Sequence, residues 1–206
     1  MESWRSHKLR LERSSDGRFR WWLDLLLLDT LVRDCIESRG TELTLWRIHR
    51  RAMDDAAGHE FAFICYAPED VRRALDVLIA GHAALRFLQN GGLLRELITG
   101  DDGPAIAATS DPTWPEPLKR AWPYYIDGVS RMALRLVDEL RASPRPALDA
   151  FSAADCEAYY SKLMAQFNEV WHDWGSHAFL HHINAVFGYQ PVVARPRSVD
   201  GMLAVF

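Results

Sequence analysis

The sequence predicts a single α+β domain over residues 1–206, with more helix than strand, and three observations lead to that prediction. Segments that alternate apolar and polar residues fill the first half, which is typical of strands with one buried face. Apolar residues at helical spacing fill the second half. A segment rich in proline and glycine, residues 99–117, connects the halves. We therefore expect a ββαββα two-layer unit over residues 1–98 and a helical part over residues 118–206.

The first hairpin is predicted from two alternating runs. Residues 8–12 alternate leucine with charged residues, and a Ser-Ser-Asp-Gly turn follows at 14–17. Asp29 is then expected to cap a short helix over residues 30–38, with Gly40 just past its end. The apolar face of the second strand consists of Phe19, Trp21, Leu23, Leu25 and Leu27.

The second hairpin is predicted over residues 42–50 and 59–67. The latter segment is apolar on both faces, which indicates a central strand covered on both sides. Pro68 then begins a helix that ends at Asn-Gly-Gly, residues 90–92. The apolar stripe of this helix is Val71, Leu75, Leu78, His82 and Leu85.

The helical part is predicted as two long helices. The first covers residues 124–142, which carry apolar residues at helical spacing. Ser152 followed by Asp155 is the pattern of a helix N-cap with an acid in the first turn. The helix that begins there is expected to extend to residue 187, with Gly175 as a point of division, and a tail with an apolar end follows at 191–206.

Composition limits the classes of partner. A net charge of -4 and a pI near 6.1 argue against nucleic acids and anionic membranes, because such binding needs a basic face. The first twenty residues are locally basic, with six basic and three acidic side chains, which we interpret as the solvated face of an edge hairpin. The N-terminus lacks the apolar stretch of a signal peptide and no apolar run is long enough to span a membrane, so we expect a cytoplasmic protein.

The cysteines give no indication of a disulfide or a metal site. Cys35, Cys65 and Cys156 are far apart in the sequence and lie among apolar neighbours. We therefore expect three reduced thiols in the core.

The densest group of chemically versatile side chains is a histidine-rich stretch near the C-terminus, where four of the eight histidines fall within eleven residues. On one helix, Asp173, His177 and His181 are four residues apart and share a face. Glu169 lies one turn earlier, and with His172 it has the Glu-x-x-His spacing of di-iron bundles. Three such ligands with an open position suit zinc or iron. The alternative is an amphipathic helix whose histidines pair with acids or carbonyl groups.

The second hairpin contributes two further candidate ligands. His49 and His59 are expected at facing ends of its strands, where cross-strand neighbours lie about 5.5 Å apart and would complete a metal site. The other interpretation is an ordinary polar hairpin end. His82, on an apolar stripe, is interpreted as a core histidine bound to a carbonyl group or a water.

Aromatic residues are concentrated in the helical half. We interpret them as the lining of a ligand pocket or as a partner surface, because aromatic side chains are enriched in both, or otherwise as core. They are Trp114, Trp122, Tyr124, Tyr125, Trp171 and Trp174.

Two functions follow from these patterns. The first is a cytoplasmic accessory or interaction protein without catalytic activity, which binds another protein chain or a second copy of itself. It is favoured because nucleotide-binding, zinc-protease and hydrolase motifs are missing from the sequence and the tail is apolar. The alternative is a zinc- or iron-dependent or histidine-based enzyme centred on residues 169–184. No cofactor is certain from the sequence.

Overall fold

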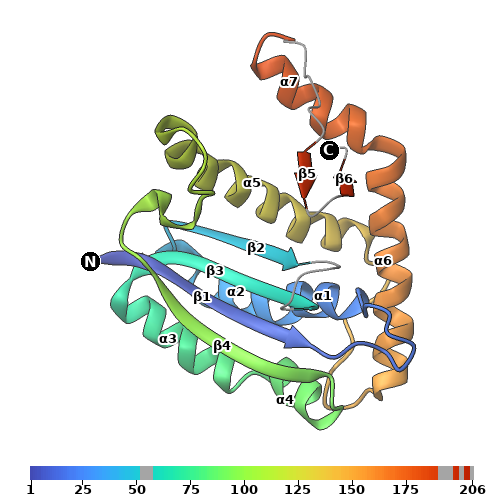
Figure 1. The fold of residues 1–206 in the computed structure, drawn as a ribbon. Helices are drawn as coiled ribbons and strands as arrows, with labels where there is room; N and C mark the ends of the chain where they lie inside the picture. The colour runs from blue at the N-terminus through green and yellow to red at the C-terminus, as the bar shows by residue number, and fades with distance from the viewer. Residues whose placement is uncertain (52–57, 190–196, 200–201, 205–206) are drawn as a thin grey trace. The chain divides into compact units, whose positions relative to one another are not determined.

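A computed structural model describes residues 1–51, 58–189, 197–199 and 202–204 (Figure 1). These residues form two compact units, Met1–Phe167 and Asn168–Phe206. Helices account for 57% of the chain and strands for 20%, which confirms the predicted α+β class and its excess of helix. The elements in chain order are β1 (Glu2–Leu11), α1 (Trp22–Leu27), the π-helix η1 (Leu28–Val32), α2 (Arg33–Arg39), the short turn η2 (Gly40–Glu42), β2 (Leu45–Arg51), β3 (Glu60–Pro68), α3 (Glu69–Ala80), α4 (Ala83–Asn90), β4 (Leu94–Gly103), the short turn η3 (Ile106–Thr109), α5 (Glu116–Leu140), α6 (Ala153–Gly175), the π-helix η4 (Ser176–His181), α7 (His182–Val186), β5 (Arg197–Val199) and β6 (Met202–Ala204).

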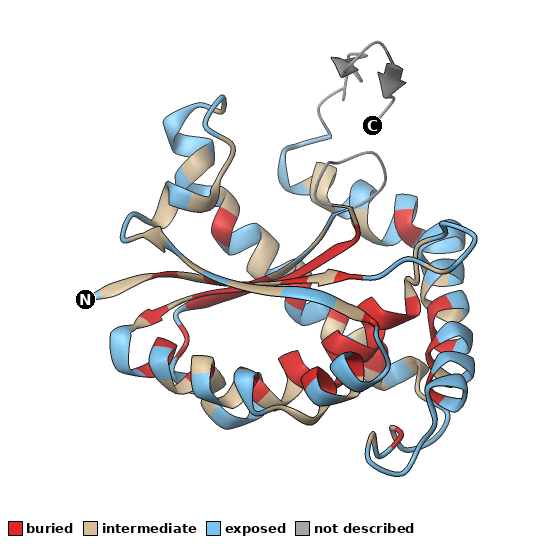
Figure 2. Ribbon diagram, turned by 60° about the horizontal axis from the view of Figure 1, so that its bottom comes forward, coloured by how far each residue is buried: buried red, intermediate tan, exposed pale blue. Residues whose placement is uncertain are grey.

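The first unit is built on a four-stranded antiparallel sheet with the strand order β2-β3-β1-β4. Helices α1 to α4 lie on one face of this sheet, and buried residues are concentrated where they meet it (Figures 1 and 2). The predicted central strand at residues 59–67 is confirmed as β3, which pairs with β2 on one side and β1 on the other. Strand β1 is also internal, so the basic N-terminal segment does not belong to an edge hairpin.

The predicted second strand of the first hairpin, residues 19–27, is wrong, because the chain is helical from Trp22 to Arg39. The positions between the alternating apolar residues are largely apolar too, so a strand here would have no polar face. A helix buries every residue from 22 to 32 instead. Asp29 therefore lies inside a helix and is not an N-cap, and Gly40 follows the last helical residue with an ordinary φ of -60°.

The remaining order also differs from ββαββα, because the predicted helix after β3 is two helices and a further strand follows them. His82 lies between α3 and α4 in an extended conformation, and its Nδ1 atom accepts a hydrogen bond from the Ala84 N–H at 3.1 Å. This histidine caps α4 and does not continue an apolar stripe. Strand β4 extends into the predicted connection, and its ten residues are all half-buried or exposed, which explains its weak apolar pattern.

Helix α5 covers the outer edge of β2. The N–H groups of Trp46 and Ile48 point away from β3, because these two residues alternate with the residues of β2 whose backbone groups pair with β3. Asp127 Oδ1 accepts from the Trp46 N–H at 2.9 Å, and Ser130 Oγ accepts from the Ile48 N–H at 3.1 Å. Two side chains of α5 thus satisfy the backbone where another strand would otherwise pair.

The predicted start of the last long helix is confirmed. The Asp155 N–H donates to Ser152 Oγ at 3.2 Å, and the Ser152 N–H donates to Asp155 Oδ2 at 3.4 Å, which is a capping box. The chain stays helical through Gly175, with φ -58° and ψ -39°, and α6 passes there directly into the π-helix η4. Gly188 has the positive φ, 74°, of a residue that terminates a helix.

Within the second unit, β5 and β6 form an antiparallel pair. The rest of the predicted apolar tail, and residues 52–57 of the second hairpin, lie outside the described residues. All three cysteines are free and buried, as predicted, and burial raises the pKa of the Cys65 thiol to about 12. Among the described residues, no helix is long and apolar enough to cross a membrane.

Candidate functional site

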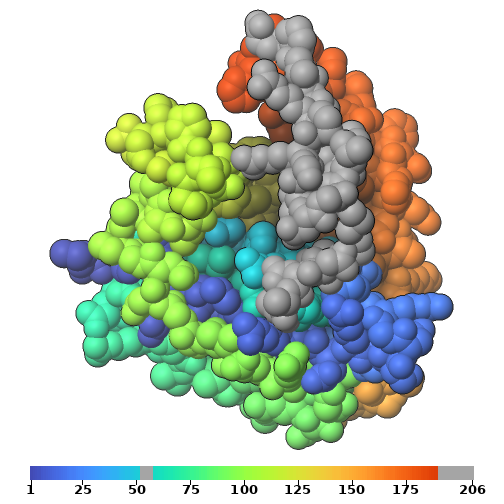
Figure 3. Space-filling model, in the orientation of Figure 1, coloured from blue at the N-terminus to red at the C-terminus, as the bar shows by residue number. Residues whose placement is uncertain are grey.

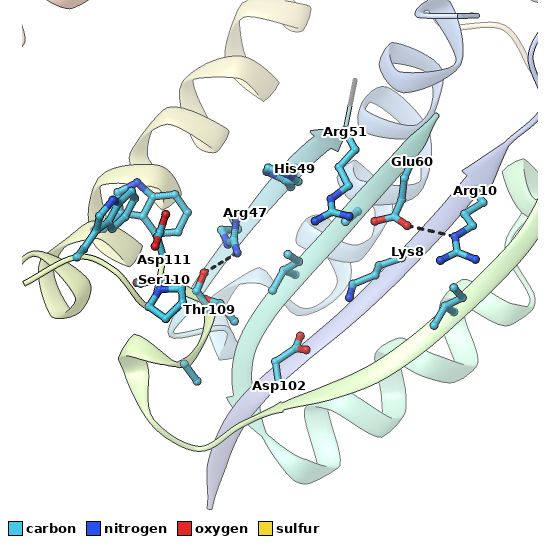
Figure 4. Close-up of a pocket in the computed structure, with 17 residues that line it drawn as sticks. Lys8, Arg10, Arg47, His49, Arg51, Glu60, Asp102, Thr109, Ser110 and Asp111 are labelled. Atoms are coloured by element: carbon cyan, nitrogen blue, oxygen red, sulfur yellow. Dashed lines mark hydrogen bonds and ion pairs between the residues drawn. The ribbon is translucent and has the colours of Figure 1, made fainter. Parts of the chain in front are cut away.

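The face of the sheet opposite α1 to α4 contains a pocket of about 740 Å³. Its floor is formed by alternate side chains of all four strands, and its wall by the chain from η3 to the start of α5. In Figure 3 this wall, coloured yellow-green, stands out from the sheet. Figure 4 shows the polar and charged side chains of the floor, which include Lys8, Arg47 and His49.

The strand register places the floor residues in rows of cross-strand neighbours. In the first row the basic and acidic side chains are equal in number. Across the sheet it contains Arg51, Glu60, Arg10 and Glu96, so basic and acidic residues alternate. Arg10 Nε lies 3.4 Å from Glu60 Oε2, and Arg10 Nη1 lies 2.8 Å from Glu96 Oε2. This row has no excess charge for a ligand to neutralise.

The next row contains two basic residues and no acidic residue. His49 and Lys8 both lie opposite Ala62, and the other cross-strand neighbour of Lys8 is Ile98. In the described part of the chain no carboxylate lies within ion-pair distance of the Lys8 ammonium group. The positive charge of this row therefore faces the pocket without an acidic residue in the same row.

The third row contains Arg47 opposite Ile64, followed by Ser6 and Gly100. Arg47 is only 7% exposed, yet among the described residues no carboxylate forms an ion pair with it. Its Nη2 atom donates to the Thr109 carbonyl oxygen at 3.2 Å, whereas its buried Nε–H has no acceptor. Burial lowers the pKa of this guanidinium to about 10, although the charge of Asp102 acts in the opposite direction.

Trp122 contacts Arg47 from the side of the wall, and Trp114 packs against Trp122. The Arg47 Cζ atom lies 4.8 Å from the centre of the Trp122 ring, which is a cation–π contact. Trp114 packs edge-on against Trp122 with ring centres 5.5 Å apart. These two members of the predicted aromatic group therefore do line a pocket.

A proline inside α5 fixes the position of the wall. Pro123 has no N–H, so the carbonyl oxygen of Lys119, one turn earlier, has no helical donor. Ser110 Oγ supplies the missing hydrogen bond at 2.7 Å. This bond ties the loop after η3 to the first turns of α5, where Trp122 lies beside Arg47.

His49 is the one predicted metal ligand that lines this pocket. Its ring is accessible, but desolvation by neighbouring atoms and the charges of Arg47 and Arg51 lower its pKa. Glu60 acts in the opposite direction and Lys8 adds to the lowering. At neutral pH His49 is therefore mostly neutral, and an anion beside it would favour protonation.

His59 lies on the other face of the sheet from His49. Its Nε2 atom lies 2.8 Å from Asp24 Oδ1, and Asp24 also accepts from Arg50 Nε at 2.7 Å. The ring is buried against Phe19 and Trp21. The strand register does not place the two predicted hairpin histidines opposite one another, because His49 pairs with Ala62.

The histidine-rich stretch belongs to the second unit, and its rings are grouped. His177 and His181 stack with ring centres 5.3 Å apart, and His182 lies 5.4 and 5.5 Å from them. Asp173 and the Glu169–His172 pair lie on α6 just before this group. Among the described residues no three His, Cys, Asp or Glu side chains are arranged to hold a metal ion, and the zinc or iron site stays a prediction.

The other predicted aromatic residues lie at the surface. Tyr124 and Tyr125 are exposed on α5, and Trp171 and Trp174 are exposed on α6 within the second unit. Trp171 stacks with Phe179 at 6.0 Å between ring centres. Tyr124 and Tyr125, which belong to the same unit as the pocket, do not line it.

Sequence reasoning missed Lys8 and Arg47. The signal was present in the alternation of Leu45, Arg47, His49 and Arg51, which puts three basic residues on one face of β2. It was not recognised because the partner strand of β1 was expected at residues 19–27. Comparison with family models, curated proteins and solved structures finds no match for this chain.

Proposed function

We propose that the protein is a binding protein that holds an anionic group, a phosphate or a carboxylate, in the pocket on the open face of its sheet. This proposal keeps the interaction class expected from the sequence and assigns it a surface. The observation that carries it is Arg47, a buried cation with no carboxylate partner in the described chain.

The free-energy cost of burying a charge supports this proposal. A buried charge loses its hydration, and proteins normally compensate with an opposite charge and hydrogen bonds. Arg47 has one carbonyl acceptor and one aromatic face, and its Nε–H is unsatisfied. An anion in the pocket would supply the missing charge and acceptor together, with Lys8 within the same cavity.

The chemistry of the site favours a compact anion. A guanidinium group binds the two oxygens of a phosphate or carboxylate in parallel, and such charge-assisted bonds are the stronger ones. The neighbouring indoles of Trp114 and Trp122 offer apolar contact to the rest of the ligand. A volume of about 740 Å³ is in the range of small-molecule pockets.

Extended polyanions fit this surface less well. The row formed by Arg51, Glu60, Arg10 and Glu96 alternates in sign, so the positive region ends after two rows. Nucleic-acid binding needs a longer run of cations, because affinity comes from many phosphate contacts. We therefore retain the expectation of a partner other than nucleic acid.

Titration with simple anions tests the proposal. Pyrophosphate and citrate, as phosphate and carboxylate probes, are titrated by calorimetry, with the Arg Nε–Hε signals followed by NMR. We expect at least one probe to bind and to shift the Arg47 signal. Arg47→Met should weaken that binding by about tenfold or more, because a charge-assisted hydrogen-bonded pair is lost.

A matched control separates this site from general charge effects. Arg135 is exposed on α5 and pairs with Glu139, so Arg135→Met removes the same charge far from the pocket floor. We expect it to leave binding unchanged. Failure of both probes to bind, or equal weakening by the two variants, would contradict the proposal.

A further inference from the structure

The two edge strands of the sheet, β2 and β4, differ in whether their outward backbone groups are hydrogen-bonded. At β2 the outward N–H groups are bonded to side chains of α5. At β4 the described residues of the first unit add no further strand on the outer side, and none of its ten residues is fully buried. Figure 1 shows β4 as the last strand on that side. An open strand edge is a template for pairing with another strand.

Register shows which backbone groups of β4 are free. The Leu11 N–H donates to the His59 carbonyl and the Glu12 N–H to the Leu93 carbonyl, so odd residues of β1 bond toward β3 and even ones toward β4. The even residues of β1 face Glu96, Ile98 and Gly100. The backbone groups of Leu97, Thr99 and Asp101 therefore point outward, whereas Arg95 lies at the register shift between Arg10 and Leu11.

We propose that two copies of this chain pair through β4, antiparallel, about a twofold axis at Ile98. In this register Leu97 lies opposite Thr99 of the second copy, and Arg95 lies opposite Asp101. Leu97, Thr99 and Asp101 are residues whose backbone groups point outward. The two Leu97–Thr99 pairs would form about four backbone hydrogen bonds, because each facing pair exchanges two.

Charge complementarity selects a second copy as the occupant. Arg95 is exposed and has no partner in the described chain, whereas Asp101 is 56% exposed on the same face. A twofold axis repeats any contact, so one complementary pair becomes two. A shift of one residue would set Arg95 opposite Gly100 and lose both pairs.

The Asp101 side chain is already fixed for such a contact. Arg5 Nη1 lies 3.0 Å from its Oδ2 atom, and Arg72 donates to its Oδ1 atom at 2.5 Å. These bonds hold the carboxylate beside β4 while more than half of the side chain remains accessible. Residue pairs that face each other across strands interact favourably when their charges are opposite.

Sedimentation velocity over a concentration series tests the proposal, and we expect a concentration-dependent dimer. Thr99→Pro removes an outward N–H but no hydrogen bond to β1, so it should leave the monomer folded and weaken dimerisation by about a hundredfold. Thr99→Val keeps the N–H and is the matched control, with dimerisation unchanged. Circular dichroism reports whether each variant folds.

A second variant keeps the test valid if the proline is not tolerated. Arg95→Glu sets like charges opposite each other twice in the dimer, and we expect dimerisation to weaken by about tenfold or more. Amide exchange of the Leu97 and Thr99 N–H groups should slow as the concentration rises. A monomer up to about 0.2 mM, or a dimer unaffected by Arg95→Glu and without this protection, would overturn the proposal.

Discussion

Arg47 and Asp29 are both buried charges, but their surroundings are opposite. Asp29 is fully buried in η1, and its Oδ1 atom lies 3.1 Å from nitrogens of both Arg33 and Arg141. Tyr160 donates to its Oδ2 atom at 3.2 Å. Arg47 has no such partner in the described chain.

The difference is that the fold neutralises the charge of Asp29 and does not neutralise the charge of Arg47. Asp29 connects η1 to the residue that follows α5, Arg141, and to Tyr160 on α6. All of its partners belong to the protein. Burial raises its pKa, while the charges of Arg141 and Arg33 act in the opposite direction. Its requirements are met within the fold. The requirements of Arg47 are not, and they point into a cavity.

Removing the charge of Asp29 should have the largest effect. Asp29→Asn leaves Arg33 and Arg141 without their central carboxylate, and we expect the free energy of unfolding to fall by about 3 kcal/mol, measured by urea denaturation. Asp138→Asn is the control, because Asp138 bonds the same two arginines but is 31% exposed. It should cost less than about 1 kcal/mol, and equal losses would remove the distinction.

The pH dependence of anion binding is the next effect in size. Desolvation, Arg47 and Arg51 lower the pKa of His49, with Lys8 adding to this and Glu60 opposing it. A bound anion favours the imidazolium form, so binding takes up a proton and should tighten as the pH falls from about 8 to 6.

Calorimetry with sulfate, whose charge is constant over this range, measures this dependence. We expect a gain of up to about tenfold in affinity, the equivalent of one pKa unit. His49→Gln should bind with little change over the same range. An equal pH dependence in both proteins would exclude His49 as its source.

The smallest expected effect is on stability at Arg47. Replacing a buried charge that lacks an acidic partner with an apolar residue of similar length removes a desolvation penalty. We expect Arg47→Met to change the free energy of unfolding by less than about 1 kcal/mol, by urea denaturation. A loss as large as that of Asp29→Asn would show that Arg47 is structural.

Sequence patterns that are compatible with only one local structure were predictable from the sequence. The run at residues 59–67 is apolar on both faces and is an internal strand, and the Ser152–Asp155 pair is a capping box. Residues 22–32 were not predictable by alternation, because a segment that is apolar at nearly every position suits a buried helix as well as a buried strand. Strand β4 was missed because a half-exposed edge strand has little apolar signal.

The candidate site could be predicted only in part, because it depends on register. Trp114 and Trp122 were recognised by type, but the contact of Trp122 with Arg47 depends on the bond between Ser110 and the Lys119 carbonyl group across the loop. The excess of positive charge emerges only when β1 lies between β3 and β4, so that Lys8 has Ala62 and Ile98 as neighbours.

The hydrogen bonds from β2 to Asp127 and Ser130 limit how large an assembly of this protein can become. In a twofold pair through β4, both outermost strands are β2, and α5 already occupies their edges. No further strand could then be added at β2, so an assembly of this kind would be closed and would not extend into a filament. Helix α5 therefore closes this edge of the sheet, and its Trp122 also lines the pocket.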